Sequence, residues 1–378
     1  PADAQVGSAL AKLPGVAGVT PAYRIQTNVV ASDQAGGSVG ALISLLGVDP
    51  ATWAQVAAPT SWRADYASAT PAALMAQLEQ HQWGSADADR SAQTGAGTPD
   101  HPIWAIVSAN FAQSQGLRVG DRFYLSLPGA YRFATSFTTG AIVADFPTLY
   151  PGNPAGGFIV ADLNDLLGAS TVYAPGEPSA VGPNEFWLQA TTDPTRRAAL
   201  LGMLNQQQSA LIIHQIVDRA ALQTTIAGNP LQVTIAGLLL AGAVIAALLA
   251  LLGSVIQATS AARLRTVQFA VLRTLGMGRA QLARMLLGEL FAVYAYGLVG
   301  GTLLGAVLAT ATLPYLQFST VAVDSGTQGT PPPMVALNPT WIALFYVALV
   351  GALALALLLT ARYAAVVKLE QSLRRAED

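Results

Sequence analysis

Asp100, His101 and Ser108 bring a carboxylate, an imidazole and a hydroxyl within nine residues of one another. These are the three groups of a Ser-His-Asp hydrolase triad. No G-x-S-x-G motif surrounds Ser108, however, and nearness along the chain does not provide triad geometry. The sequence therefore does not predict a hydrolase site here.

The other residues with catalytic potential are isolated as well. None of the three histidines lies in an H-E-x-x-H motif; they are His81, His101 and His214. Neither lysine follows a glycine, so the chain has no G-x-x-x-x-G-K-[ST] phosphate loop, and it has no cysteine. Glu185 and the pair Asp162/Asp165 are interpreted as surface or helix-capping carboxylates. We expect no catalytic, cofactor or metal site, no enzyme activity and no nucleic-acid partner.

The charges divide the chain into two parts. Charged residues make up 11% of the sequence, against about 25% in a typical soluble domain. Residues 1–229 carry 10 Lys and Arg against 16 Asp and Glu, a net charge of −6, whereas residues 230–378 carry 9 against 5, a net charge of +4. The two parts therefore face different surroundings, and we expect one domain at 1–229 and a membrane domain at 230–378.

Three apolar segments are long enough to cross a bilayer. Residues 231–256 are uncharged over 26 residues, a helix of about 39 Å against a hydrocarbon core of roughly 30 Å. Residues 340–361 are uncharged too. Residues 286–313 contain one charge, Glu289, which is tolerable near the interface or against another helix but costly facing lipid. The sequence predicts an all-α region of three transmembrane helices over these ranges.

The loops between these segments predict their orientation. The connection 257–285 holds five arginines, whereas the connection 314–339 has Asp324 as its one charge. The tail 362–378 is again basic. Because cytoplasmic loops carry an excess of Lys and Arg, 257–285 and the tail are predicted to be cytoplasmic. The protein would then be a multi-pass protein of the plasma (inner) membrane, with its large domain outside the cytoplasm.

Small residues line one face of the second apolar segment. Gly297, Gly301 and Gly305 recur every four residues, which lets another helix approach closely. Two interpretations stay open, since glycine is also simply common in membrane helices. We expect a packing face against a neighbouring helix or a second protomer.

Residues 1–229 mix helix and strand patterns, which indicates an α+β domain. Asp49-Pro50, Thr70-Pro71 and Asp193-Pro194 are typical helix starts, and Asp162 is expected to cap another helix. Further helices are expected at 4–13 and 108–115, and strands at 19–31, 103–107, 123–127, 131–138, 140–145, 157–161, 185–191 and 211–217. The Gly/Ser/Asp-rich segments 84–102 and 174–184 are expected to be surface loops. The first is interpreted as a plain connector rather than a mobile binding loop.

The basic segment between the first two spans has an unusual surface. When residues 264–275 are placed on a helix, apolar side chains form a stripe along one side. On the opposite side, Phe269 stands between Arg265 and Arg273. Gly276 can end that helix in the left-handed conformation, and Gly278 can begin the next. The arginines could merely hold the loop inside the cell. Alternatively, an aromatic ring flanked by arginines is a common interface anchor, which favours a docking surface.

The sequence RLRTVQFAVLRTLGMGRAQLARMLLGE (263–289) resembles the signature of the FtsX-like permeases, the membrane subunits of MacB/LolC-type ABC transporters. The matching residues are Leu272, Arg273, Gly276 and Glu289. Gln268 stands where the family usually has Glu, and Gly278 replaces a more usual Ser-like cap. The domain at 1–229 resembles the MacB-like periplasmic core in GVDP (47–50), SANFAQSQGLRVGDRF (108–123) and GGFIVADL (156–163).

The resemblance implies a transporter subunit whose ATP is bound and hydrolysed by a separate cytoplasmic ABC ATPase. A second permease half or protomer and the lipid bilayer would be its other partners. The coupling contacts implied are Phe269, Leu272 and Arg273, with Arg265 and Arg279 beside them and Gly276 and Gly278 at the turn. A fourth span would precede the large domain, which agrees with a chain that starts at Pro1 rather than Met. A signalling or scaffold relative that regulates a cell-wall hydrolase or senses peptides is the alternative.

Overall fold

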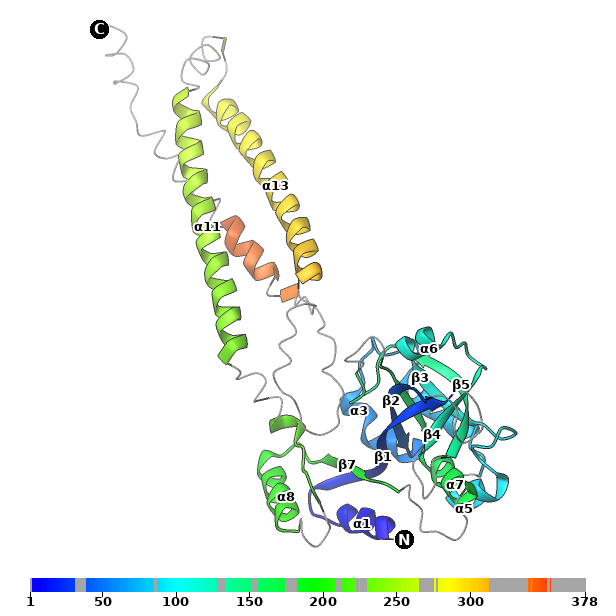
Figure 1. Ribbon diagram of the computed structural model, residues 1–378. Coiled ribbons are helices and arrows are strands. Elements are labelled where there is room, and N and C mark those ends of the chain that lie inside the picture. Colours follow the sequence, from blue (N-terminus) through cyan, green and yellow to red (C-terminus); the bar gives the residue numbers. More distant parts are fainter. Residues whose placement is uncertain are drawn as a thin grey trace. The chain divides into compact units, whose positions relative to one another are not determined.

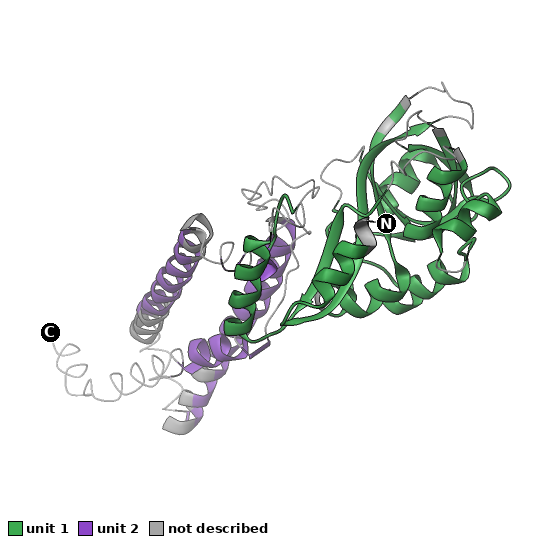
Figure 2. Ribbon diagram, turned by 90° about the horizontal axis from the view of Figure 1, so that it is seen from below, with its two compact units in different colours: residues 1–217, 319–331 green, residues 218–318, 332–378 purple. Residues whose placement is uncertain are grey.

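The computed structural model divides into two compact units, with a boundary between Val217 and Asp218 (Figure 2). It describes residues 2–30, 39–84, 87–127, 133–150, 156–173, 182–207, 213–221, 224, 230–264, 275–276, 278–312, 339–340, 342–351 and 354. The sequence predicted this boundary at residue 229. Residues 225–229 are not among the described residues.

The first unit is built on seven strands that form one sheet. In chain order they are β1 (Val16–Val30), β2 (Val39–Val48), β3 (Ile103–Ser108), β4 (Arg122–Leu127), β5 (Phe133–Val143), β6 (Phe158–Asp162) and β7 (Glu185–Ala190). The spatial order is β2-β6-β3-β5-β4-β1-β7, and β2 also pairs with β1. Six strands therefore close on themselves, and β7 extends the sheet from β1.

The long strand β1 makes this closure possible because its two halves have different partners. Residues 16–22 pair antiparallel with β7, whereas residues 22–30 pair antiparallel with β2. Its end, Asn28–Val30, pairs on the opposite edge with β4. The remaining pairs are parallel for β2–β6 and β3–β5 and antiparallel for β3–β6 and β4–β5. One strand thus joins the closed part of the sheet to the β7 extension.

Apolar cores cover both faces of the closed sheet at β6. In β6, Ile159 and Ala161 enter one apolar core, and Phe158 and Val160 enter another. A strand buried on both faces reads as a continuous apolar run. A third, smaller core lies beside β7, where Leu10 of α1 (Ala2–Ala11) meets Leu200 and Leu204 of α8 (Pro194–Gln206). Figure 1 shows α1 and α8 at this end of the unit.

Local capping explains where most of the other helices of the first unit begin. Asp49, Thr70 and Asp193 each cap a helix with proline in its first turn, as predicted. Ser108 caps α6 and left-handed Gly116 ends it. The helices are α2 (Pro50–Val56), α3 (Ala58–Ser61), α4 (Pro71–Gln80), α5 (Ala88–Thr94), α6 (Ala109–Gln115) and α7 (Leu163–Tyr173).

Three expectations for the first unit are wrong. The strands expected at 131–138 and 140–145 are one strand, β5, and Gly140 lies inside it, where a Cβ would stand 1.8 Å from the Trp104 ring. The segment 84–102 is not only a connector, since it contains α5 with Asp87 as its cap. Residues 213–217, within the strand expected at 211–217, have no strand structure, although Ile213 and Ile216 pack against the third core.

The second unit contains long apolar helices. They are α11 (Pro230–Leu264) and α13 (Arg279–Thr312), and the shorter helix 342–351 follows them. Within the described residues, Phe291–Ala311 is the one helix long and apolar enough to cross a membrane. The apolar stretches Gly237–Gly253 and Ile342–Gly351 are shorter, so the prediction of three spans stays unconfirmed.

Candidate functional site

The turn between α11 and α13 is the candidate site that the sequence singled out. Gly276 has a φ of 91°, the left-handed region that favours glycine, as predicted. Gly278 lies directly before α13, and its backbone N–H donates to Gln281 Oε1 at 3.1 Å. This side chain satisfies one of the donors that a helix start leaves open. The chain therefore turns at Leu275–Gly276, and α13 begins at Arg279.

The predicted coupling contacts themselves lie outside the described residues. Arg265, Phe269, Leu272 and Arg273 all fall in 265–274. Arg279 is the first residue of α13, and Glu289 lies in the same helix. Their roles stay predictions.

The glycine face of α13 is open among the described residues. A Cβ added at Gly297, Gly301 or Gly305 would meet no atom within 4 Å. One contact does link α13 to the helix 342–351, since the hydroxyls of Thr302 and Tyr346 lie 2.5 Å apart. The glycine face is thus available for a further helix.

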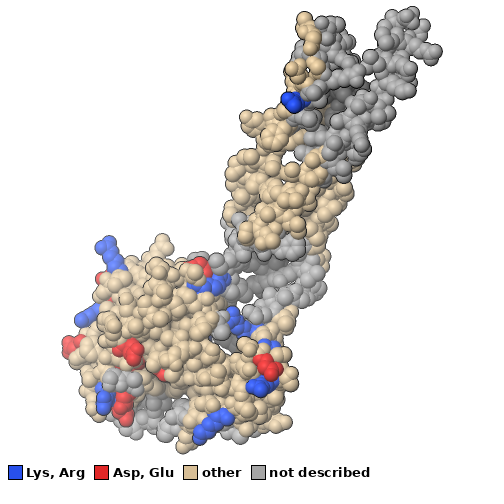
Figure 3. Space-filling view, turned by 180° about the vertical axis from the view of Figure 1, so that it is seen from behind, with Lys and Arg blue, Asp and Glu red and all other residues tan. Residues whose placement is uncertain are grey.

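The charges are distributed unevenly over the surface. In the view of Figure 3, charged side chains gather on the first unit, and the described surface of the second unit shows very few. Large apolar side chains of α11 and α13 are exposed, including Leu239, Phe291 and Leu303 at 65%, 73% and 64%. An apolar surface of this extent marks contact with lipid or with other apolar helices.

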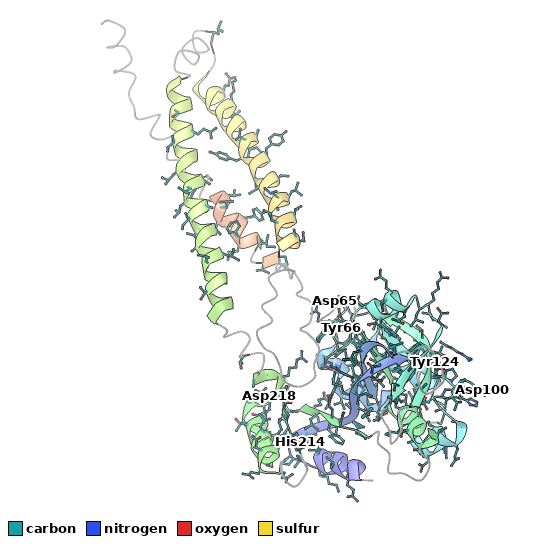
Figure 4. All side chains as sticks on the ribbon, viewed as in Figure 1. Asp65, Tyr66, Asp100, Tyr124, His214 and Asp218 are labelled. Carbon is teal, nitrogen blue, oxygen red and sulfur yellow. The ribbon has the colours of Figure 1, made fainter. Side chains whose placement is uncertain are left out.

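The structure does not assemble a triad from Asp100, His101 and Ser108. Ser108 Oγ accepts from the backbone N–H groups of Phe111 and Phe158 at 3.3 and 3.0 Å. The His101 ring packs edge-on against the Trp83 indole, with centroids 4.7 Å apart. In Figure 4, Asp100 and His214 lie at opposite sides of the first unit. Within the part of the chain that the structure describes, no cluster of three or more His, Asp or Glu could hold a metal ion.

A buried ion pair that the sequence did not reveal joins β1 to β7. Arg24 Nε donates to Glu185 Oε1 at 2.6 Å, and the two side chains are 8% and 32% exposed. The Arg24 guanidinium also donates to the carbonyl oxygen of Thr148 at 3.3 Å and to the hydroxyl oxygen of Thr148 at 2.6 Å. Thr148 has a φ of 68°, an uncommon conformation for a residue with a side chain. Glu185 is thus a structural partner, not a surface carboxylate.

The carboxylate of Asp165 is a second correction, because it neither caps a helix nor lies on the surface; Asp165 and Asp162 are both only 1% exposed. Asp162 caps α7 as predicted, accepting from the backbone N–H groups of Asn164 and Asp165 at 2.8 and 3.0 Å. Asp165 accepts from Ser91 Oγ at 2.6 Å. Ser91 lies 74 positions away in the sequence, so no local pattern could have indicated this contact.

The match to a protein family agrees with this division of the chain. Residues 218–368 match the family described as FtsX-like permease C-terminal. The C-terminal part of the chain therefore resembles the FtsX-like permeases, and the predicted resemblance is confirmed there. Members of the FtsX-like permease family are embedded in the membrane. No curated protein matches the sequence.

Among solved structures, the chain is similar to the periplasmic region of MacB from Actinobacillus actinomycetemcomitans. The identity is 9%, the match covers 60% of this chain and 83% of that one, and the TM-score is 0.31. It is also similar to the extracellular domain of the noncanonic ABC-type transporter YknZ from Gram-positive bacteria. There the identity is 10%, the coverage is 55% and 86%, and the TM-score is 0.29.

Proposed function

We propose that this chain is a permease subunit that couples a separate cytoplasmic ABC ATPase to movement of its large extracytoplasmic domain. The observation that carries the proposal is the family match over residues 218–368. That range includes the basic segment with its five arginines and the long apolar helices on either side. The cargo would be a lipid, lipoprotein, peptide or drug that is exported or extracted outside the bilayer.

The chain's own residues would supply binding and movement, while ATP is bound by the partner. The ATPase would dock on 257–285, where the aromatic ring of Phe269 is flanked by Arg265 and Arg273. Buried aromatic and arginine side chains carry much of the binding energy of protein interfaces. Closure of the ATPase on ATP would move α11, which runs into this segment, and α13, which begins in it. The motion would reach the first unit through the residues that precede α11.

Replacement of Phe269 by Asp tests the docking step. The added carboxylate cannot fill an apolar pocket on the ATPase and has no reason to disturb the spans, so we expect co-purification of the ATPase to be lost while membrane insertion persists. Pull-down from detergent extracts followed by mass spectrometry measures this loss and identifies both ATPase and cargo.

The matched control is Phe318→Asp, the same change in the connection 314–339 that is predicted to lie on the other side of the membrane. This variant should retain the ATPase. Equal retention by both variants would remove the assignment of 257–285 as the coupling segment.

A further inference from the structure

The segment 82–94 covers the start of α7 and can be treated as a latch. It follows α4, contains α5, and is described except for residues 85–86. Gln82 Nε2 donates to Asp162 Oδ2 at 2.6 Å, and the Trp83 backbone N–H donates to Asp165 at 3.1 Å. Ser91 Oγ donates to Asp165 Oδ1 at 2.6 Å. The latch thus binds Asp162 through Gln82, and Asp165 through both Trp83 and Ser91.

The latch lies so close to α7 that no water layer fits between them. A Cβ at Gly168 of α7 would stand 2.5 Å from Ser91 Cβ and 2.8 Å from the Ala92 nitrogen. The latch also closes on itself, because Thr94 Oγ1 donates to the Trp83 carbonyl at 2.7 Å. Asp162 and Asp165 can therefore become hydrated only if the latch lifts. Such a close approach of two helices depends on glycine, because any side chain at position 168 would collide with α5.

The two carboxylates share this enclosure without a cation. Among the described residues, no ion pair within 4.0 Å involves either of them. Asp162 contacts backbone N–H groups and Gln82, all uncharged donors. The charged and titratable side chains on the neighbouring elements are Asp49, Glu79, His81, Asp87, Asp89, Arg90 and His101. Arg90 faces Asp87, with Nε 3.9 Å from Oδ2, and both side chains are more than half exposed.

Burial makes ionisation of this pair unfavourable. Loss of solvation, and then the charge of Asp165, raise the pKa of Asp162 to about 7. Burial also raises the pKa of Asp165, while the hydrogen bonds from Ser91 and Trp83 oppose that rise. An isolated buried charge costs several kcal/mol in typical proteins, so such groups take up a proton instead.

We propose that the latch segment 82–94 is a pH-sensitive element that docks on α7 more tightly as the pH falls. The docked conformation keeps two neighbouring carboxylates out of water, and protonation of one of them removes their repulsion. The latch itself lines a hollow of about 480 Å³ with Gln82, Trp83, Gly84, Arg90, Gln93 and Thr94. Acidification therefore holds the latch on α7, and alkaline conditions favour its release.

The direction of this pH dependence follows from the linkage between protonation of Asp162 and docking of the latch. When the latch lifts, Asp162 regains the ordinary pKa of 3.8, whereas the docked value is about 7. The docked state thus binds the proton more strongly, so docking gains stability as the pH falls from about 7 towards 4 and is insensitive to pH well above 7. A single group of this kind changes the docking equilibrium by about tenfold between pH 8.5 and pH 6.

Hydrogen–deuterium exchange of the full chain in detergent tests this inference. After correction for intrinsic exchange, the backbone amides of α5 should exchange about tenfold more slowly at pH 6 than at pH 8.5. The amides of α6, which lies outside the latch, provide an internal control in the same sample. Exchange from α5 that is independent of pH after correction overturns the proposal.

Substitutions assign the effect to the carboxylate pair. Asp162→Asn removes the buried charge, so α5 should be protected to the same degree at both pH values. Asp145→Asn is the matched control, because Asp145 is also buried with a raised pKa, and the charges that act on it are those of Asp65 and Arg63, outside the latch. This variant should keep the pH dependence of α5. A pH dependence that persists in Asp162→Asn contradicts the proposal.

Gln82→Leu gives a second measurement that does not depend on Asp162→Asn folding correctly. The Gln82 hydrogen bond lowers the pKa of Asp162, so its loss should move the midpoint of the α5 transition to higher pH. A purely structural role of Gln82 would change protection without moving the midpoint. An unmoved midpoint therefore counts against the proposed role of Asp162.

Discussion

At the scale of single residues, Arg24 holds three parts of the first unit together. Its guanidinium binds Glu185 of β7 and both polar groups of Thr148, whose φ of 68° needs external support. Glu185 in turn accepts from Trp187 Nε1 at 3.0 Å. The position lies in β1 just past Ala22, where the pairing with β7 ends. Loss of this side chain would leave a partly buried carboxylate without its cation.

We therefore expect Arg24→Ala to lower the free energy of unfolding of the first unit by about 1–3 kcal/mol. Arg196→Ala is the matched control, because the Arg196–Asp193 pair is 75% and 47% exposed at a distance of 3.6 Å. An exposed pair of this kind contributes about 0–1 kcal/mol. Unfolding in urea, followed by tryptophan fluorescence of the chain in detergent, measures both. Equal losses would mean that Arg24 has no special role.

At the scale of elements, α13 has surfaces that other described residues leave uncovered. A Cβ added on its glycine face would meet no described atom within 4 Å, and its large apolar side chains are exposed. A glycine face allows two helix backbones to approach closely, and the gain comes from packing rather than from the hydrophobic effect. We expect this face to bind a helix of a second protomer or permease half.

Gly301→Leu should block that approach and weaken helix association. Because the chain has no cysteine, single cysteines at Leu304 or Leu308 can report association by disulfide crosslinking in membranes. Gly288→Leu is the matched control, since 100° per residue places Gly288 on the other side of α13. A crosslinking pattern that Gly301→Leu leaves unaltered would exclude this packing face.

At the scale of the whole molecule, the proposed function depends on which side of the membrane each part occupies. The basic segment is predicted to be cytoplasmic and residues 1–229 to be outside. We expect a membrane-impermeant maleimide to label Asp100→Cys in intact cells, because Asp100 is exposed on the first unit (Figure 4). Arg273→Cys should react only after the cells are permeabilised. Labelling of Arg273→Cys before Asp100→Cys would reverse the topology and remove the coupling mechanism.

Much of the first unit was predictable because its signals are local. A capping side chain acts on backbone groups two or three residues away, so Asp49, Thr70 and Asp193 identify helix starts from sequence alone. The strand β2 was not predicted, because both faces are buried and its residues therefore lack the alternation that indicates a strand. The strand expected at 211–217 is not formed by its described residues 213–217, because Ile213 and Ile216 pack against the third core without forming a ladder.

By itself, the sequence determined the division of charge between the two parts, the apolar segments, the turn at Gly276 and the permease resemblance. Each of these depends on composition or on residues within a few positions of one another. Only the tertiary structure decided that six strands close through β1, that Arg24 meets Glu185 across 161 positions, and that Ser91 covers Asp165. Those contacts arise from chain closure over long separations, and no periodic pattern in a sequence records which distant segments will meet.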